Sequence, residues 1–348
     1  METRKLGRTG LDVGVIGLGT EHIQGGPEVH AEILRLCAEA GANYIDLLYI
    51  EPEYWETFGP VLRPLRDHFV LSAHWSSGPE YDIAFCERTF ENVLAQVGND
   101  HVEVAMMTMI DDGDRREAAW REASLERLRR YQEQGRVGYI GASAHDPDVA
   151  REAVEGGWVD VLMFPVNMVW HEEAKQQALY RACVEHDVGL VAMKAYHGST
   201  LFTVNGKPSG ITPAQCLSYV FSLPVAVAVP GPKNVDEWRS TLSYLEATEA
   251  EKDYSSVLGD LRSLLAGQCV YCHHCLPCSE DIQIGWVIWH LDQVASRGLD
   301  QVREWYQGFP VKASACIECG VCMERCPFGV DIPAKMQEAA TAFEEQAI

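Results

Sequence analysis

The chain has 348 residues, 47% of them hydrophobic and 23% charged, which is ordinary for a globular protein and long enough for one large and one small domain. Its formal net charge of −23 argues against nucleic acid or an anionic membrane as a partner. The sequence has no N-terminal apolar signal core and no run of 18 apolar residues, so we expect a cytoplasmic protein.

Eight apolar segments, rich in β-branched residues, follow one another along the first two thirds of the chain. Continuous apolar runs are typical of strands buried on both faces, and helix-patterned segments lie between these runs. The alternation predicts an α/β fold, a (β/α)8 TIM barrel, with a short hairpin over residues 4–15 at its bottom. The predicted strands are residues 15–19, 43–48, 69–75, 102–109, 136–143, 159–166, 188–195 and 225–231.

Polar side chains follow each predicted strand, at the end of the barrel where chemistry is found in this architecture. They are Thr20, Glu21, His22, Asp46, Glu51, His74, Thr108, Ser143, His145, Asn167, Lys194, His197 and Lys233. Glu51 and His74 are predicted to form an acid/base pair oriented by Asp46, because imidazole and carboxylate exchange protons near neutral pH. The alternatives are local hydrogen bonding alone, or a mononuclear metal held by the same three residues.

Twelve cysteines are unevenly spread along the chain. Four lie in apolar or helix-patterned stretches and are expected to be small buried hydrophobes: Cys37, Cys86, Cys183 and Cys216. The other eight fall between residues 269 and 326, which separates a small C-terminal domain, residues 256–348, from a barrel of residues 1–255. Gly298 is expected to divide two helices between the cysteine motifs.

The eight clustered cysteines form two motifs. Three thiols spaced two residues apart can wrap three corners of an iron–sulfur cube, and in two-cluster ferredoxins the fourth cysteine ligates the other cluster. Structural zinc uses two separated ligand pairs, and disulfides are not expected in a cytosolic chain. We therefore predict a small α-helical ferredoxin-like domain with two [4Fe–4S] clusters. One takes Cys269, Cys272, Cys275 and Cys326, and the other takes Cys316, Cys319, Cys322 and Cys278.

Four ordered segments of the barrel resemble the aldo-keto reductase superfamily: RKLGRTGLDVGVIGLGT, GANYIDLLY, GRVGYIGASAHD and VAVPGPKN. The cysteine motifs resemble those of its subgroup with a C-terminal ferredoxin-like domain. The superfamily uses an Asp, Tyr, Lys, His tetrad with NADPH. The resemblance places Asp46 at the aspartate, and Glu51, His74 and Thr108 at the other three positions, with Tyr49 a neighbouring tyrosine.

The resemblance also implies contacts for NADP(H). Ser143 matches the serine that holds the nicotinamide amide, and Gly231 and Lys233 suit a phosphate. Four other cofactor positions depart from the superfamily pattern, which argues against tight NADP(H) binding: Ala144, Met163, Glu237 and Thr241.

The function predicted from these features is an iron–sulfur oxidoreductase whose clusters exchange electrons with a small organic substrate in the barrel mouth. A ferredoxin-like or other redox partner would connect it to an electron source. Two alternatives stay open: a catalytically silent barrel serving as an electron-transfer or assembly subunit, and an NADPH-linked reductase that feeds the clusters or is fed by them.

Overall fold

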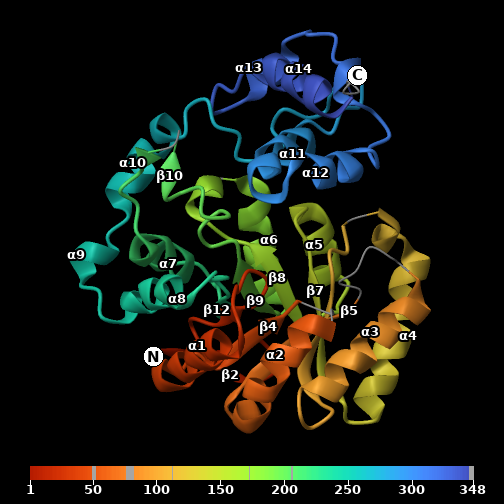
Figure 1. Ribbon diagram of the computed structural model, residues 1–348, viewed down its shortest axis with the longest axis vertical. Coiled ribbons are helices and arrows are strands. Elements are labelled where there is room, and N and C mark those ends of the chain that lie inside the picture. Colours follow the sequence, from red (N-terminus) through yellow and green to blue (C-terminus); the bar gives the residue numbers. More distant parts are fainter. Residues whose placement is uncertain (49–51, 76–81, 112, 172, 205–206, 345–348) are drawn as a thin grey trace. The chain divides into compact units, whose positions relative to one another are not determined.

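The computed structural model describes residues 1–348 except 49–51, 76–81, 112, 172, 205–206 and 345–348 (Figure 1). The chain divides into two compact units. The first comprises residues 1–201 and 211–254, and the second comprises residues 202–210 and 255–348. Among the described residues, no helix is both long and apolar enough to cross a membrane.

The first unit is built around a sheet of eight parallel strands in the order β12-β9-β8-β7-β6-β5-β4-β3. A parallel bridge between Ile16 and Ala228 joins the two edges, so the sheet is a nearly closed barrel. The eight predicted strand segments are confirmed, with shorter ends. They are β3 (Leu18–Gly19), β4 (Tyr44–Leu47), β5 (Val70–Trp75), β6 (Val102–Met107), β7 (Val137–Ser143), β8 (Val161–Pro165), β9 (Gly189–Met193) and β12 (Val227–Ala228).

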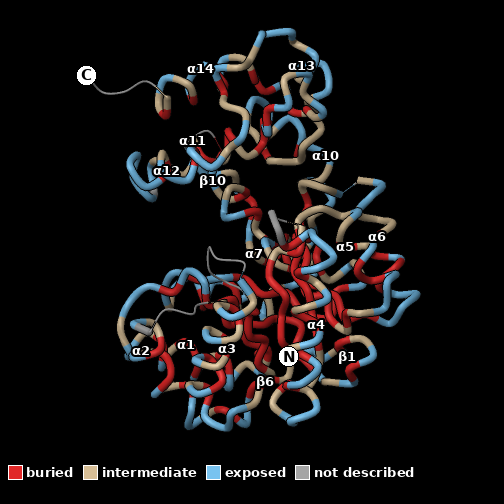
Figure 2. Tube along the Cα trace, turned by 90° about the vertical axis from the view of Figure 1, so that its right-hand side faces the viewer, coloured by how far each residue is buried: buried red, intermediate tan, exposed pale blue. Residues whose placement is uncertain are grey.

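Amphipathic helices alternate with these strands and bury one face each (Figure 2). In α1, Ile33, Leu34 and Cys37 are buried, and the helix ends at Gly41, whose φ of 77° is open to glycine. The helices are α1 (Pro27–Ala40), α2 (Pro52–Leu62), α3 (Ile83–Gln96), α4 (Ala118–Glu133), α5 (Pro147–Glu155), α6 (Ala174–Glu185), α7 (Pro213–Phe221), α8 (Val235–Leu242) and α9 (Glu249–Lys252), with short 3-10 turns at Arg63–His68, Gly113–Arg116, Met168–Trp170 and Ser243–Leu245.

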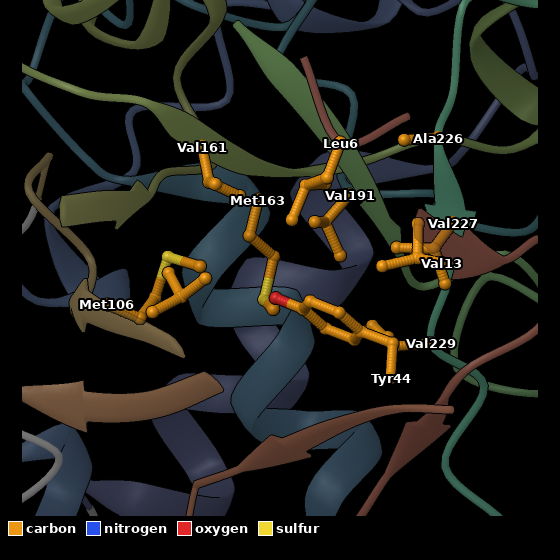
Figure 3. Close-up of a cluster of buried hydrophobic side chains, with 11 residues drawn as sticks. Leu6, Val13, Tyr44, Met106, Val161, Met163, Val191, Ala226, Val227 and Val229 are labelled. Atoms are coloured by element: carbon orange, nitrogen blue, oxygen red, sulfur yellow. The ribbon is translucent and has the colours of Figure 1, made fainter. Parts of the chain in front are cut away.

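An antiparallel hairpin, β1 (Thr3–Lys5) with β2 (Asp12–Gly14), closes the end of the barrel where the strands begin. Its Leu6 and Val13 are fully buried in the cluster that fills the barrel, beside Tyr44 (Figure 3). Gly7 pairs with the residue before β9, and a Cβ there would lie 2.3 Å from the nitrogen of Gly189, so glycine is required. The predicted hairpin is confirmed, and it leaves the other end of the barrel for chemistry.

The second unit is mainly helical. In its core, Val287 and Ile288 of α11 and Val302 and Tyr306 of α12 are buried. Gly298, with a φ of 87°, separates α11 from α12 as predicted. Its elements are β10 (Thr203–Val204), β11 (Lys207–Pro208), α10 (Ser255–Leu264), α11 (Ile284–Arg297), α12 (Leu299–Tyr306), the 3-10 turn Ala313–Ala315, α13 (Val321–Arg325) and α14 (Ile332–Phe343).

Candidate active site and cysteine cavities

Three polar side chains from neighbouring strand ends form a hydrogen-bonded chain at the barrel mouth. Asp46 belongs to β4 and His74 to β5, and Thr108 follows β6 directly. The Nε2 atom of His74 lies 3.0 Å from Oδ1 of Asp46, and its Nδ1 atom lies 3.0 Å from Oγ1 of Thr108. All three residues are buried. The sequence order Asp46, His74, Thr108 is therefore also their order in space.

The hydrogen bonds place a proton between His74 and Asp46. Thr108 has one hydroxyl proton, and its oxygen also lies 2.9 Å from the carbonyl oxygen of Trp75, which only accepts. If the hydroxyl donates to Trp75, the Nδ1–H of His74 donates to Thr108, and a further proton is needed between Nε2 and Asp46. If the hydroxyl donates to Nδ1, the Nε2–H donates to Asp46. In both arrangements the contact between Nε2 and Oδ1 carries a proton.

Two further predicted catalytic residues, Tyr49 and Glu51, lie outside the described residues. The proposed pairing of Glu51 with His74 therefore stays a prediction. Tyr44, which is described, sits in the barrel core, where burial raises its pKa above the usual range for a phenol. It is thus placed to fill the barrel rather than to donate a proton (Figure 3).

A second polar group lies further round the ring of strand ends, at β6, β7 and β9. The carboxylate of Asp111 accepts hydrogen bonds from the backbone nitrogens of His145 and Asp146, each at 2.5 Å, and so fixes the turn after β7. Burial raises the pKa of Asp111. Asp111 was not among the predicted site residues. An acidic run after the predicted strand of residues 102–109 could have indicated it: Asp111, Asp112 and Asp114.

Lys194 reaches His145 across the strand ends, with 2.9 Å between its Nζ and the Nε2 of His145. The Lys194 side chain is partly open to solvent. The surrounding protein nevertheless desolvates its ammonium group and lowers its pKa, and this effect outweighs the negative charges of Glu21 and Asp111, which raise the pKa. Its backbone φ of 54° is unusual for a residue with a side chain. Lys194 and His145 thus form a pair of basic side chains at the strand ends, with part of Lys194 open to solvent.

Several residues at the predicted NADP(H) contact positions make hydrogen bonds within the protein. Oγ of Ser143 is buried and accepts a hydrogen bond from the nitrogen of Met109 at 2.8 Å. At the start of α8, the Glu237 carboxylate accepts from the backbone nitrogen of Lys233 at 2.7 Å. Thr241 is buried and accepts from the hydroxyl of Tyr196 at 3.1 Å. A negative charge therefore lies where the superfamily places groups for the adenosine end of NADP(H).

Gly231 lies close to the first strand end: a Cβ added to it would be 3.3 Å from the ring of His22. The backbone of Lys233 is also fixed here, because its carbonyl oxygen accepts a hydrogen bond from the nitrogen of Gln24. These contacts tie the turn after β12 to the turn after β3 at the barrel mouth.

The eight clustered cysteines of the second unit line two cavities. The larger, about 250 Å³, is lined by the thiol-bearing residues Cys278, Cys316, Cys319 and Cys322, and Cys275 reaches it as well. The smaller, about 20 Å³, is lined by Cys269, Cys272, Cys275 and Cys326. The smaller cavity thus has three cysteines of the first motif and one of the second, and the larger has three of the second motif and two of the first.

The two sets of thiols differ in exposure. Burial raises the pKa of Cys269 and of Cys275 to about 12, whereas Cys319 is exposed. Among the described residues, no three His, Cys, Asp or Glu side chains are arranged to hold a single metal ion. The four cysteines predicted to be small hydrophobes are all buried in the first unit: Cys37, Cys86, Cys183 and Cys216.

A comparison with known families now identifies the barrel. The aldo/keto reductase family matches residues 15–215, more than half of the chain. The chain belongs to the aldo/keto reductase family. The resemblance stated from the sequence is confirmed at that level. The eight cysteines that line the cavities lie beyond the matched range.

The individual relatives have low sequence identity to this chain. The uncharacterized oxidoreductase YqkF of Bacillus subtilis (strain 168) is 23% identical over an alignment of 206 residues, and the match covers 55% of this chain and 64% of that protein. The aldo-keto reductase AKR11C1 from Bacillus halodurans is similar in fold. Its holo form has 19% identity and a TM-score of 0.59, covering 74% of this chain and 96% of that one. Its apo form has 18% identity and a TM-score of 0.57 over the same shares.

Proposed function

We propose that this aldo/keto reductase is an iron–sulfur oxidoreductase, with two [4Fe–4S] clusters in the second unit and a small organic substrate at the barrel mouth. The observation that carries the proposal is the crossed lining of the two cavities: each has the first three cysteines of one motif together with the last cysteine of the other, Cys326 or Cys278. That distribution is the ligand pattern of two-cluster ferredoxins.

The chemistry of the donors fits this cofactor. The larger cavity is lined by five free cysteines and the smaller by four, Cys275 being shared, and thiolates are the ligands that hold iron–sulfur clusters. The Cys278 cavity has room at about 250 Å³. The Cys326 cavity is about 20 Å³, close to the space of one water, so its thiols would have to move outward to hold a cube. When bound, the clusters supply one-electron exchange.

The barrel supplies proton handling. Asp46 and His74 hold a proton between them in a buried site, and Thr108 fixes the imidazole from its other side. A substrate reduced or oxidised in single-electron steps gains or loses protons as well, and this pair is placed to hold one of them. We assign Glu51, with Tyr49 beside it, to exchange that proton with the substrate, on the strength of the family resemblance.

The alternative of an NADPH-linked reductase is supported by the family and by the buried Ser143. It is opposed by the Glu237 carboxylate at the start of α8 and by the hydrogen bond that occupies Thr241. The resemblance expects an uncharged adenine-side contact at Glu237, and a carboxylate there repels the nearby anionic cofactor. We therefore propose that electrons reach the substrate from the clusters and a separate redox partner rather than from NADP(H).

The test of the clusters is anaerobic purification with analysis of iron and acid-labile sulfide. Two cubanes give about eight of each per chain and a brown protein that bleaches with dithionite. Cys326→Ala should damage the cluster of Cys269, Cys272 and Cys275, and Cys183→Ala, the matched control, should keep the full iron content. Stoichiometric zinc with little iron would overturn the proposal.

A further inference from the structure

Exposed apolar side chains gather on one cysteine loop of the second unit. Among the described residues, six large apolar side chains are exposed, and three of them lie between Cys316 and Cys326. These three are Ile317 at 61%, Val321 at 40% and Met323 at 42% exposure, and we call them the apolar collar. Exposed apolar side chains grouped on one loop, rather than scattered singly, mark a surface that binds another molecule.

The apolar collar lies on the loop that carries Cys316, Cys319 and Cys322, the more accessible thiols. Ile317 and Val321 line the cavity of about 250 Å³ together with the exposed Cys319. The other cavity is lined by no residue of the collar. The exposed apolar surface is thus confined to one of the two proposed cluster sites.

The loop of residues 316–326, which carries the apolar collar, has an unusual backbone conformation. Glu318 has a φ of 55° and Gly320 a φ of 77°, so the chain turns sharply on either side of Cys319. Such a conformation costs free energy at a residue with a side chain and persists only where the surroundings fix it. Arg325 donates from Nη1 to the carbonyl oxygen of Pro277 at 2.8 Å and ties this loop to the loop that carries Cys278. These features define the backbone conformation that presents the collar.

Acidic side chains flank the apolar collar. Glu318 and Glu324 are exposed on the same loop, and Glu280 lines the cavity from the other side. Arg325 on the same loop is exposed and keeps its positive charge while it donates to the carbonyl oxygen of Pro277, so three carboxylates outnumber one cation. A protein face that fits this surface has an apolar centre and a basic rim, since opposite charges steer association and like charges suppress it.

We propose that the apolar collar docks a one-electron carrier protein with a basic contact face, and that electrons pass between this carrier and the cluster of Cys278, Cys316, Cys319 and Cys322. This inference rests on the proposed function. The step moves one electron from the reduced member of the pair to the oxidised one, and no bond or proton changes place.

The experiment uses the intact, cluster-loaded protein and cytochrome c, a basic one-electron carrier, as the probe. Dithionite-reduced protein is freed of excess reductant and mixed with oxidised cytochrome c in a stopped-flow instrument. The double variant Glu318→Lys with Glu324→Lys should lower the second-order rate constant about tenfold at low salt. The difference should shrink at ~1 M salt, where the screening length falls to about 3 Å.

Matched controls lie on α12, whose residues line neither cavity. Asp300→Lys with Glu304→Lys makes the same change in net charge at two exposed positions and should leave the rate constant within about twofold. Ile317→Ser should slow the reaction severalfold, whereas Leu299→Ser, at another exposed apolar residue, should not. Equal effects of the collar and α12 variants would overturn the docking proposal.

A second readout separates docking from electron transfer. Zinc-substituted cytochrome c, which accepts no electron, should bind the protein in calorimetry, and the Glu318 and Glu324 double variant should weaken that binding by about the same factor. Iron and sulfide are measured in every variant beforehand. A protein without clusters refutes the proposed function. A loaded protein that does not bind the probe, or binds it without regard to Glu318 and Glu324, refutes only the docking site.

Discussion

The two units of the chain achieve order by different means. The barrel surrounds a closed cluster of buried apolar side chains, and its polar chain of Asp46, His74 and Thr108 is satisfied by its own hydrogen bonds. In the second unit, two loops turn their thiols toward cavities rather than toward each other. The barrel core is thus ordered by apolar packing, whereas the second unit gathers thiols at cavities.

Removal of iron should have the largest effect, and it should affect the second unit far more than the barrel. Chelation of the anaerobic protein should raise amide exchange in residues 268–330 by orders of magnitude, because loops that bind a cofactor lose their main restraint without it. The barrel strands should keep their protection, since they depend on apolar packing. Hydrogen exchange read by mass spectrometry reports both units at once. Unfolding of both units together would contradict the difference we draw.

Replacing His74 by alanine tests the barrel alone. The change leaves the buried Asp46 without its partner and should lower the free energy of unfolding by about 1–3 kcal/mol, measured by urea denaturation. Substrate turnover should be lost, and the cluster spectra should not change. His186→Ala, at an exposed histidine, is the control and should alter neither. A variant with full turnover would favour the silent-barrel alternative.

Nicotinamide binding tests whether the barrel keeps the usual redox cofactor of its family. Four altered contacts, each worth about 0.5–1.5 kcal/mol, should leave no micromolar affinity in a fluorescence titration with NADPH. Removing the charge with Glu237→Gln should improve the affinity modestly, because a repulsive carboxylate is lost. Tight binding by the unaltered protein would instead support the NADPH-linked alternative.

The smallest effect concerns Lys194. Its pKa lies below that of an ordinary lysine, near 10.4, because the surrounding protein desolvates the ammonium form. A larger share of Lys194 is therefore neutral at pH 8–9, and its acetylation should reach half its maximal rate at a lower pH than that of the exposed Lys207 in the same digest. Peptide mass spectrometry measures both. Identical pH profiles would show that the amine is as well solvated as a surface lysine.

Much of the candidate site was predictable because parallel strands bring their ends to one rim. Asp46, His74 and Thr108 each close a predicted strand, so their proximity follows from the order of the strands. Asp111 was not predicted, since its role is to hold the backbone of His145 and Asp146 across a gap of more than thirty residues. Such a bond depends on the conformation of two loops, which no local pattern reports.

The sequence by itself determined the eight strands, the hairpin, the division between barrel and cysteine-rich segment, and the family, because periodicity, spacing and ordered motifs are local properties of a chain. The sequence also predicted how the eight cysteines group. Only the tertiary structure decided the size of each cavity, which thiol is open to solvent, and that Ile317, Val321 and Met323 stay exposed on the same loop. The exposure of a side chain depends on which residues pack over it, and those residues often come from segments that are distant in the sequence.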